Sequence, residues 1–152
     1  MQLRITREQA ALPIDELSEI YGACLYRAAP EDCRAALLSH LMNPAVCCFA
    51  ALDSNRPVGL LTVQQTLERA EILGIAVHPA GRGQGVGRAM ILRAQSDLAP
   101  LPLTAETDDD AVNFYRRCGF TCEAFSRAFP DGTVRRWRCI LASLFIKEFH
   151  HG

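Results

Sequence analysis

Apolar residues recur along this chain with two spacings, and these spacings predict an alternation of strands and helices. Apolar positions three or four residues apart are typical of an amphipathic helix, whereas alternation or a short apolar run is typical of a strand. Strands are predicted over residues 2–6, 46–52, 58–67, 70–77, 101–106, 120–129 and 133–141. Helices are predicted over residues 12–26, from residue 30 to Asn43-Pro44, over 85–98, and from a cap at 107–110 to residue 118. The predicted order is therefore β-α-α-β-β-β-α-β-α-β-β.

Two pairs of successive strands are joined by turn sequences, at residues 53–57 and at Pro130-Asp131-Gly132. Hairpins and helical crossovers in one chain favour an α/β (α+β) fold, with a mixed and mostly antiparallel sheet of about seven strands and about four helices. The chain shows no internal repeat or linker, and 152 residues is about the size of one domain. We therefore expect a single domain over residues 1–152.

The composition narrows the class of protein. The hydrophobic content is 49%, the charged content is 22% and the net charge is −1, so there is no overall basic field to attract nucleic acid or an anionic membrane. The N-terminus is charged and alternating, and no apolar stretch approaches the roughly 20 residues of a membrane span. The seven cysteines are odd in number and mostly lie in apolar runs without a C-x-x-C, which favours free thiols over disulfides or a metal site. We expect a soluble cytoplasmic protein without a bound metal.

The most informative segment is a glycine-rich loop between the strand at 70–77 and the following helix. Four glycines occur in seven residues, Gly81 to Gly87. Such a loop at the start of a helix exposes backbone N–H groups that favour a phosphate. The spacing does not match a Walker A loop, which needs Lys and Ser or Thr after the last glycine, and it does not match the G-x-G-x-x-G of a dinucleotide-binding fold. Binding of ATP or NAD is therefore disfavoured.

The loop Arg82-Gly83-Gln84-Gly85-Val86-Gly87 resembles the Gln/Arg-x-x-Gly-x-Gly/Ala loop of the GNAT superfamily of acyl-CoA N-acyltransferases, and the predicted element order resembles that of the family. The resemblance implies a GNAT fold that transfers an acetyl or other acyl group from acetyl-CoA to a primary amine by direct attack in a ternary complex. It implies that loop amides bind the CoA pyrophosphate and that the preceding strand pairs with the pantetheine arm. The cofactor-binding residues that it implies are Ile75, Ala76, Val77, Arg82, Gly83, Gln84, Gly85, Val86, Gly87 and Arg88.

A second segment, residues 111–120, also resembles the family, in which a Phe-Tyr pair is followed by Gly-Phe. The resemblance implies that Tyr115 lies near the CoA sulfur and protonates the departing thiolate, while a packing role is the alternative. One departure is that Asp108 stands where the family often has an Asn that contacts CoA. We expect Asp108 to serve mainly as a helix cap.

Transfer to an amine requires the neutral amine. A lysine-like amine, with a pKa of about 10.4, costs roughly 4.6 kcal/mol to deprotonate at pH 7. For the departing thiol of CoA, the difference between its pKa and pH 7 corresponds to only about 2 kcal/mol. A general base is therefore the greater need. Glu71, on the strand that would carry the pantetheine arm, is the candidate base, because some family members place a catalytic Glu there. Glu106 is the competitor and could instead bind the amine.

The sequence leaves the acceptor open, whether it is a small molecule or a protein amine. Arginines of the last two strands suit an acidic acceptor, but alternating arginines are more often a solvated face. A non-catalytic acyl-CoA-binding sensor of the same fold is the alternative function, and the pair of Glu71 and Tyr115 argues against it. A homodimer and the use of longer acyl groups also remain open.

Overall fold

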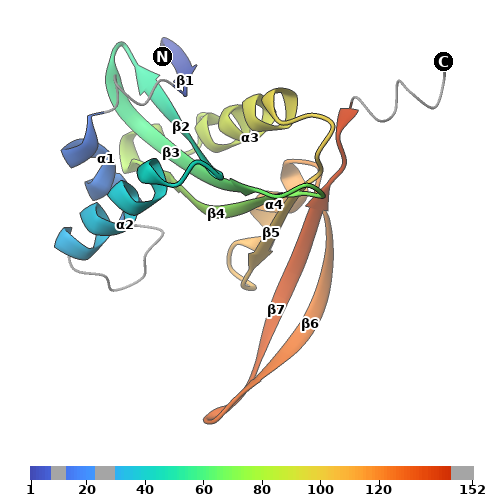
Figure 1. Cartoon of the computed structure of the whole chain (residues 1–152). Helices are drawn as coiled ribbons and strands as arrows, with labels where there is room; N and C mark the ends of the chain where they lie inside the picture. Colours follow the sequence, from blue (N-terminus) through green and yellow to red (C-terminus); the bar gives the residue numbers. More distant parts are fainter. Residues whose placement is uncertain (8–12, 23–29, 145–152) are drawn as a thin grey trace.

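The computed structural model describes residues 1–7, 13–22 and 30–144, and its seven strands form one sheet in the order β1-β2-β3-β4-β5-β7-β6 (Figure 1). The strands are β1 (Leu3–Thr6), β2 (Val46–Asp53), β3 (Arg56–Gln65), β4 (Ala70–Val77), β5 (Leu103–Thr107), β6 (Thr121–Phe129) and β7 (Gly132–Leu141). The four α-helices of this part of the chain are α1 (Ile14–Tyr21), α2 (Pro30–Met42), α3 (Val86–Asp97) and α4 (Val112–Arg117), and a 3-10 turn, η2 (Pro79–Gly81), precedes α3. The predicted element order and fold class are confirmed.

The sheet is antiparallel except where β4 meets β5. These two strands are parallel and pair at only two positions, Ala70 with Leu103 and Glu71 with Thr104. Beyond this point β4 continues to Val77 along β3, while β5 continues to Thr107 along β7. The sheet therefore consists of two halves joined at one end, with a gap between β4 and β5 beyond the joint. The β6–β7 hairpin extends well away from the rest of the sheet (Figure 1).

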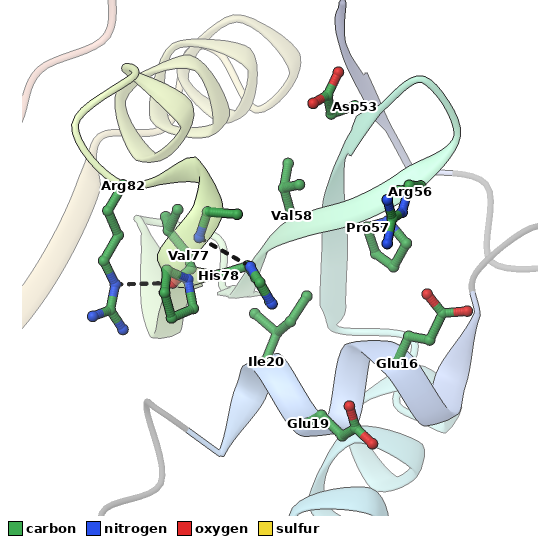
Figure 2. A pocket seen from close by; sticks show the side chains of 12 residues that line it. Glu16, Glu19, Ile20, Asp53, Arg56, Pro57, Val58, Val77, His78 and Arg82 are labelled. Carbon is green, nitrogen blue, oxygen red and sulfur yellow. Dashed lines mark hydrogen bonds between the residues drawn. The ribbon is translucent and has the colours of Figure 1, made fainter. Parts of the chain in front are cut away.

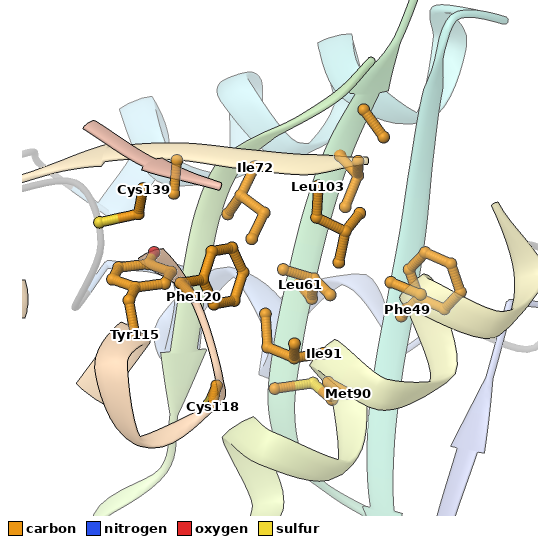
Figure 3. Close-up of a cluster of buried hydrophobic side chains, with 14 of the residues drawn as sticks. Phe49, Leu61, Ile72, Met90, Ile91, Leu103, Tyr115, Cys118, Phe120 and Cys139 are labelled. Atoms are coloured by element: carbon orange, nitrogen blue, oxygen red, sulfur yellow. The ribbon is translucent and has the colours of Figure 1, made fainter. Parts of the chain in front are cut away.

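Helices cover the two faces of the sheet, and each face has its own apolar core. On the α1/α2 face, Leu17, Tyr21 and Leu37 pack against inward residues of β2 and β3. The larger core lies on the α3/α4 face and includes Phe49 and Met90 (Figure 3). Because side chains alternate along a strand, the cores identify the face to which each residue of β4 and β5 points.

The β2–β3 hairpin is tighter than the predicted turn at 53–57. Ser54 and Asn55 have positive φ values of 49° and 71°, as a two-residue type I′ turn requires. The strands therefore extend to Asp53 and Arg56, and Pro57 lies within β3. A bulge follows Pro57, since Leu52 pairs with Pro57 and Ala51 pairs with Gly59. Proline tolerates this position because a bulge interrupts the regular ladder.

The predicted helices at 12–26 and 107–118 are shorter in the structure. Helix α1 covers Ile14–Tyr21, and residue 12 and residues 23–26 lie outside the described residues. Helix α4 begins only at Val112, because Asp108 first forms a turn in which its carboxylate accepts from the backbone N–H groups of Asp110 and Ala111, at 3.0 and 2.9 Å. Asp108 thus stabilises the turn that precedes α4, a role close to the helix cap that was expected.

Candidate active site

The glycine loop lies between the end of β4 and the start of α3, and two of its glycines have backbone conformations that other residues rarely adopt. Gly83 and Gly85 have φ values of 75° and 78°, and a Cβ at either position would meet no atom within 4 Å. The glycines are therefore needed for the backbone path, and the space beside them is open to a ligand. Gly85 caps α3, whose first N–H groups point into the loop.

A third glycine of the loop brings α4 against α3. A Cβ at Gly87 would lie 2.9 Å and 3.0 Å from two carbon atoms of the Phe114 ring, so the ring packs directly on the helix backbone. This contact closes one side of a cavity of about 380 Å³ beside the loop. Its lining residues are Val77, Gly81, Arg82, Gly83, Gly85, Val86, Gly87, Arg88, Phe114, Arg117 and Cys118.

Seven of the ten predicted cofactor-binding residues line this cavity, and the remaining three are Ile75, Ala76 and Gln84. The Gln84 side chain instead donates to the carbonyl oxygen of Ala80, at 3.2 Å, and so braces the loop. Ile75 and Ala76 lie in β4, where the backbone groups of successive residues point alternately toward the gap and toward β3. The predicted cofactor-binding residues thus lie in one region, but seven line the cavity, one braces the loop and two belong to the neighbouring strand.

A second cavity, of about 570 Å³, lies between α1, the β2–β3 turn and the end of β4 (Figure 2). It shares Val77 and Arg82 with the loop cavity, and Arg82 donates to the carbonyl oxygen of Val77 at 3.2 Å. The two cavities differ in charge. Three carboxylates line the larger one, those of Glu16, Glu19 and Asp53, whereas no carboxylate lines the loop cavity. A polyphosphate therefore fits the loop cavity better.

The backbone of β4 alternates between β3 and the gap. His78 N–H donates to Val58 carbonyl oxygen at 2.8 Å, so this is a hydrogen-bonded pair. Hydrogen-bonded and non-hydrogen-bonded pairs alternate in an antiparallel ladder. The register from Val77 with Gly59 to Ile75 with Leu61 is continuous, which directs the N–H groups of Ile75 and Val77 into the gap. The backbone groups of Ala76 instead face β3.

A bulge interrupts β4 between this stretch and Glu71. Gly74 pairs with Thr62 and Ile72 pairs with Val63, so Leu73 has no partner on β3. The buried Tyr21 of α1 holds this point, because its hydroxyl lies 3.1 Å from that of Thr62, which lies 3.5 Å from the carbonyl oxygen of Gly74. A Cβ at Gly74 would lie 2.9 Å from the Tyr21 ring. Position 74 therefore has no room for a side chain.

The two candidate bases lie on the same face of the sheet, on either side of the gap. The neighbours of Glu71 and Glu106 in their strands, including Ile72 and Ala105, belong to the α3/α4 core, so both glutamates point toward the α1/α2 face. Glu71 is half-buried, lies at the joint of β4 and β5, and makes no ion pair with any described residue.

Glu106 is engaged by two arginines of the β6–β7 hairpin. Both of its carboxylate oxygens contact Arg127, at 2.8 and 3.1 Å, and the Nε of Arg136 lies 3.5 Å away. A bidentate arginine pair is among the stronger interactions of a carboxylate. The carboxylate of Glu106 is thus held in ion pairs with described residues, whereas that of Glu71 is not.

Tyr115 is 6% exposed and lies in the α3/α4 core, where its ring packs edge-on against Phe114 and Phe120 at centroid distances of 5.3 and 5.2 Å (Figure 3). It lines neither cavity. Cys118, one turn later, does line the loop cavity, and burial raises the pKa of its thiol. A protonated buried thiol is a poor nucleophile, which disfavours an acyl-enzyme on Cys118.

The sequence of residues 14–120 matches the family described as the acetyltransferase (GNAT) family. The match covers more than half of the chain. The chain belongs to the GNAT acetyltransferase family.

Solved structures of GNAT acetyltransferases share this fold. One is an acetyltransferase of the GNAT family from Desulfovibrio desulfuricans, with 24% identity and a TM-score of 0.71 over 93% of this chain and 98% of that chain. Another is the ribosomal-protein-S18-alanine N-acetyltransferase from Escherichia coli, with 20% identity and a TM-score of 0.70 over 93% and 94% of the two chains. A third is an aminoglycoside 6′-N-acetyltransferase complexed with coenzyme A, with 16% identity and a TM-score of 0.72 over 90% and 94%. Among curated proteins, none matches the sequence.

The described residues of this GNAT chain contain no group of three or more His, Cys, Asp or Glu side chains that could hold a metal ion. Within the same ranges, no helix is both long and apolar enough to cross a membrane.

Sequence reasoning missed several residues of the site. Arg117 and Phe114 line the cavity together with the glycine loop, and Tyr21 and Thr62 hold the bulge of β4. The sequence did carry a signal for Arg117, because it lies three residues after Phe114 and residues at this spacing share a helix face. No sequence pattern indicated that Tyr21 and Thr62, 41 residues apart, would meet.

Proposed function

We propose that this GNAT chain transfers the acetyl group of acetyl-CoA to a primary amine by direct attack. The observation that carries the proposal is the carboxylate-free, arginine-lined cavity at the glycine loop, which opens beside a strand whose N–H groups face the gap. The open space at Gly83 and Gly85 suits the pyrophosphate, and the N–H groups of Ile75 and Val77 suit the pantetheine arm. A protein with the same fold has been solved in complex with coenzyme A, which supports acyl-CoA as the donor.

In the proposed reaction, Glu71 accepts a proton from the amine, directly or through water, as the amine nitrogen attacks the thioester carbonyl. The new C–N bond forms, the C–S bond breaks, and the sulfur leaves with the electron pair of that bond. Glu71 is the better base of the two glutamates, since the carboxylate of Glu106 is held by Arg127 and Arg136.

Tyr115 is the proposed acid that protonates the departing sulfur. Removing its hydroxyl while keeping its buried ring separates this role from a packing role. We expect Tyr115→Phe to lower kcat by about 10-fold or more while the Kd for acetyl-CoA changes less than about twofold, because the ring contacts remain and only the hydroxyl is lost. Steady-state kinetics and calorimetry measure the two quantities. If kcat stays at the wild-type value, Tyr115 serves packing alone.

The proposed function is tested by acetyl-CoA binding in a calorimeter, followed by a thiol-release assay with a panel of amines. The panel includes amino acids, polyamines, aminoglycosides and peptides with free N-termini or lysines. Binding together with release stimulated by one class of amine supports the proposal and names the acceptor. Tight binding without release from any amine would instead favour an acyl-CoA sensor, and failure to bind would contradict both.

A further inference from the structure

Three arginines line the loop cavity, and two of them, Arg88 and Arg117, have no hydrogen bond or ion pair among the described residues, whereas Arg82 donates to the carbonyl oxygen of Val77. Arg88 lies in the first turn of α3 and Arg117 in the last turn of α4, and neither forms an ion pair with any described residue. All six ion pairs found among the described residues involve other arginines. The cavity therefore holds two guanidinium groups that are not paired with a carboxylate of any described residue.

The packing of α4 on α3 explains how Arg117 reaches this cavity. The ring of Phe114 rests on Gly87, which fixes one face of α4 against the loop. Arg117 follows Phe114 by three residues and so lies on the same face of the helix. The surroundings of Cys118 agree with this placement. Burial raises the pKa of its thiol, and the nearby charges of Arg88 and Arg117 act in the opposite direction.

The glycine loop offers donors for a pyrophosphate even before the two unpaired arginines of the cavity are considered. The N–H groups of the glycine loop and of the first turn of α3 already supply donors for a pyrophosphate. Arg82 lines the cavity as well, with its Nε donating to Val77. CoA carries a further phosphate, a monoester on its 3′ oxygen, and a monoester has a charge of about −1.5 to −2 at pH 7. This group is the remaining anion that two unpaired guanidiniums would suit.

We propose that Arg117, together with Arg88, binds the 3′-phosphate of CoA and makes the site select CoA over donors that lack this phosphate. This inference rests on the proposed function, since it concerns the donor of the same reaction. It assigns α4 a direct part in donor recognition, in addition to the loop and strand that the family resemblance implied.

The test compares CoA with 3′-dephospho-CoA by calorimetry. We expect the wild-type protein to bind CoA about 10-fold more tightly. We expect Arg117→Gln to remove most of this preference while the Kd for 3′-dephospho-CoA stays nearly unchanged, and Arg88→Gln to give the same pattern. Arg117→Lys should keep part of the preference because it keeps the charge. The preference should also shrink between about 50 mM and about 500 mM NaCl.

Arg116→Gln is the matched control. Arg116 is the preceding residue of the same helix, but its guanidinium stacks on Trp137 at 4.6 Å and donates to Asn113 at 3.0 Å. This variant should keep the wild-type preference, and thermal unfolding should show that all variants fold. Equal binding of both ligands by the wild-type protein, or an equal loss for both ligands in Arg117→Gln, would overturn the inference but leave the proposed function standing. Failure of the wild-type protein to bind either ligand would overturn both.

Discussion

Glu71→Gln is expected to lower kcat/KM by about 100- to 1000-fold at pH 7, which lies in the lower part of the range that a positioned general base contributes. Glutamine keeps the size of the side chain at the joint of β4 and β5 but cannot accept the amine proton. The deficit should shrink as the pH rises toward the pKa of the amine, since the amine then loses its proton without help. The pH dependence of kcat/KM, measured with one identified acceptor, tests this expectation.

Two other glutamates provide comparisons for this variant. Glu68→Gln is the same chemical change three residues earlier, at an exposed position before β4, and should leave the profile unchanged. Glu106→Gln would leave Arg127 and Arg136 without their carboxylate and should lower activity by a similar factor at every pH. If Glu106→Gln instead shows the deficit that recovers at high pH, the two glutamates exchange roles.

Gly87→Ala is expected to weaken acetyl-CoA binding by about 10-fold or more and to lower the free energy of unfolding by about 1–3 kcal/mol. The added methyl group would meet the Phe114 ring at 2.9 Å, so the ring, and the helix that carries it, would have to give way. Helix α4 would therefore shift away from α3, together with the lining of the loop cavity. Calorimetry and denaturant unfolding measure the two effects.

A second substitution separates this collision from a loss of glycine itself. In a Phe114→Leu background, the extra methyl group has a smaller and more flexible neighbour, so Gly87→Ala should cost less than in the wild-type protein. The difference between the two costs is the coupling energy of the pair. Equal costs in both backgrounds would show that the ring contact does not determine the effect.

The elements that depend on local pattern could be predicted from the sequence. Strand β4 was predicted over the observed residues, Ala70–Val77, because it is an unbroken apolar run bounded by a polar turn and by His78-Pro79. The closing hairpin followed in the same way from Pro130-Asp131-Gly132. The glycine loop indicated a phosphate site because its spacing is specific, and spacing is a property of the sequence alone.

The features that depend on contacts between distant residues could not be predicted. The bulge at Leu73 is invisible in the apolar run of β4, since an extra residue there leaves the pattern of side-chain types unchanged. The pairing of Arg127 with Glu106, which supports the choice of Glu71 as the proposed base, joins residues 21 positions apart and was not indicated by the sequence. Periodicity shows which face of an element is apolar, but it does not show which element that face will meet.

The short joint between β4 and β5 has a consequence for amide hydrogen exchange. In a continuous sheet, every N–H of a central strand is protected. Here, protection along β4 should alternate from one residue to the next, with the N–H of Ala76 exchanging slowly and those of Ile75 and Val77 exchanging quickly. A donor bound along this edge would slow the two fast amides and link the two halves of the sheet into one unit. The exchange rates of these two amides would then show whether a donor occupies the gap.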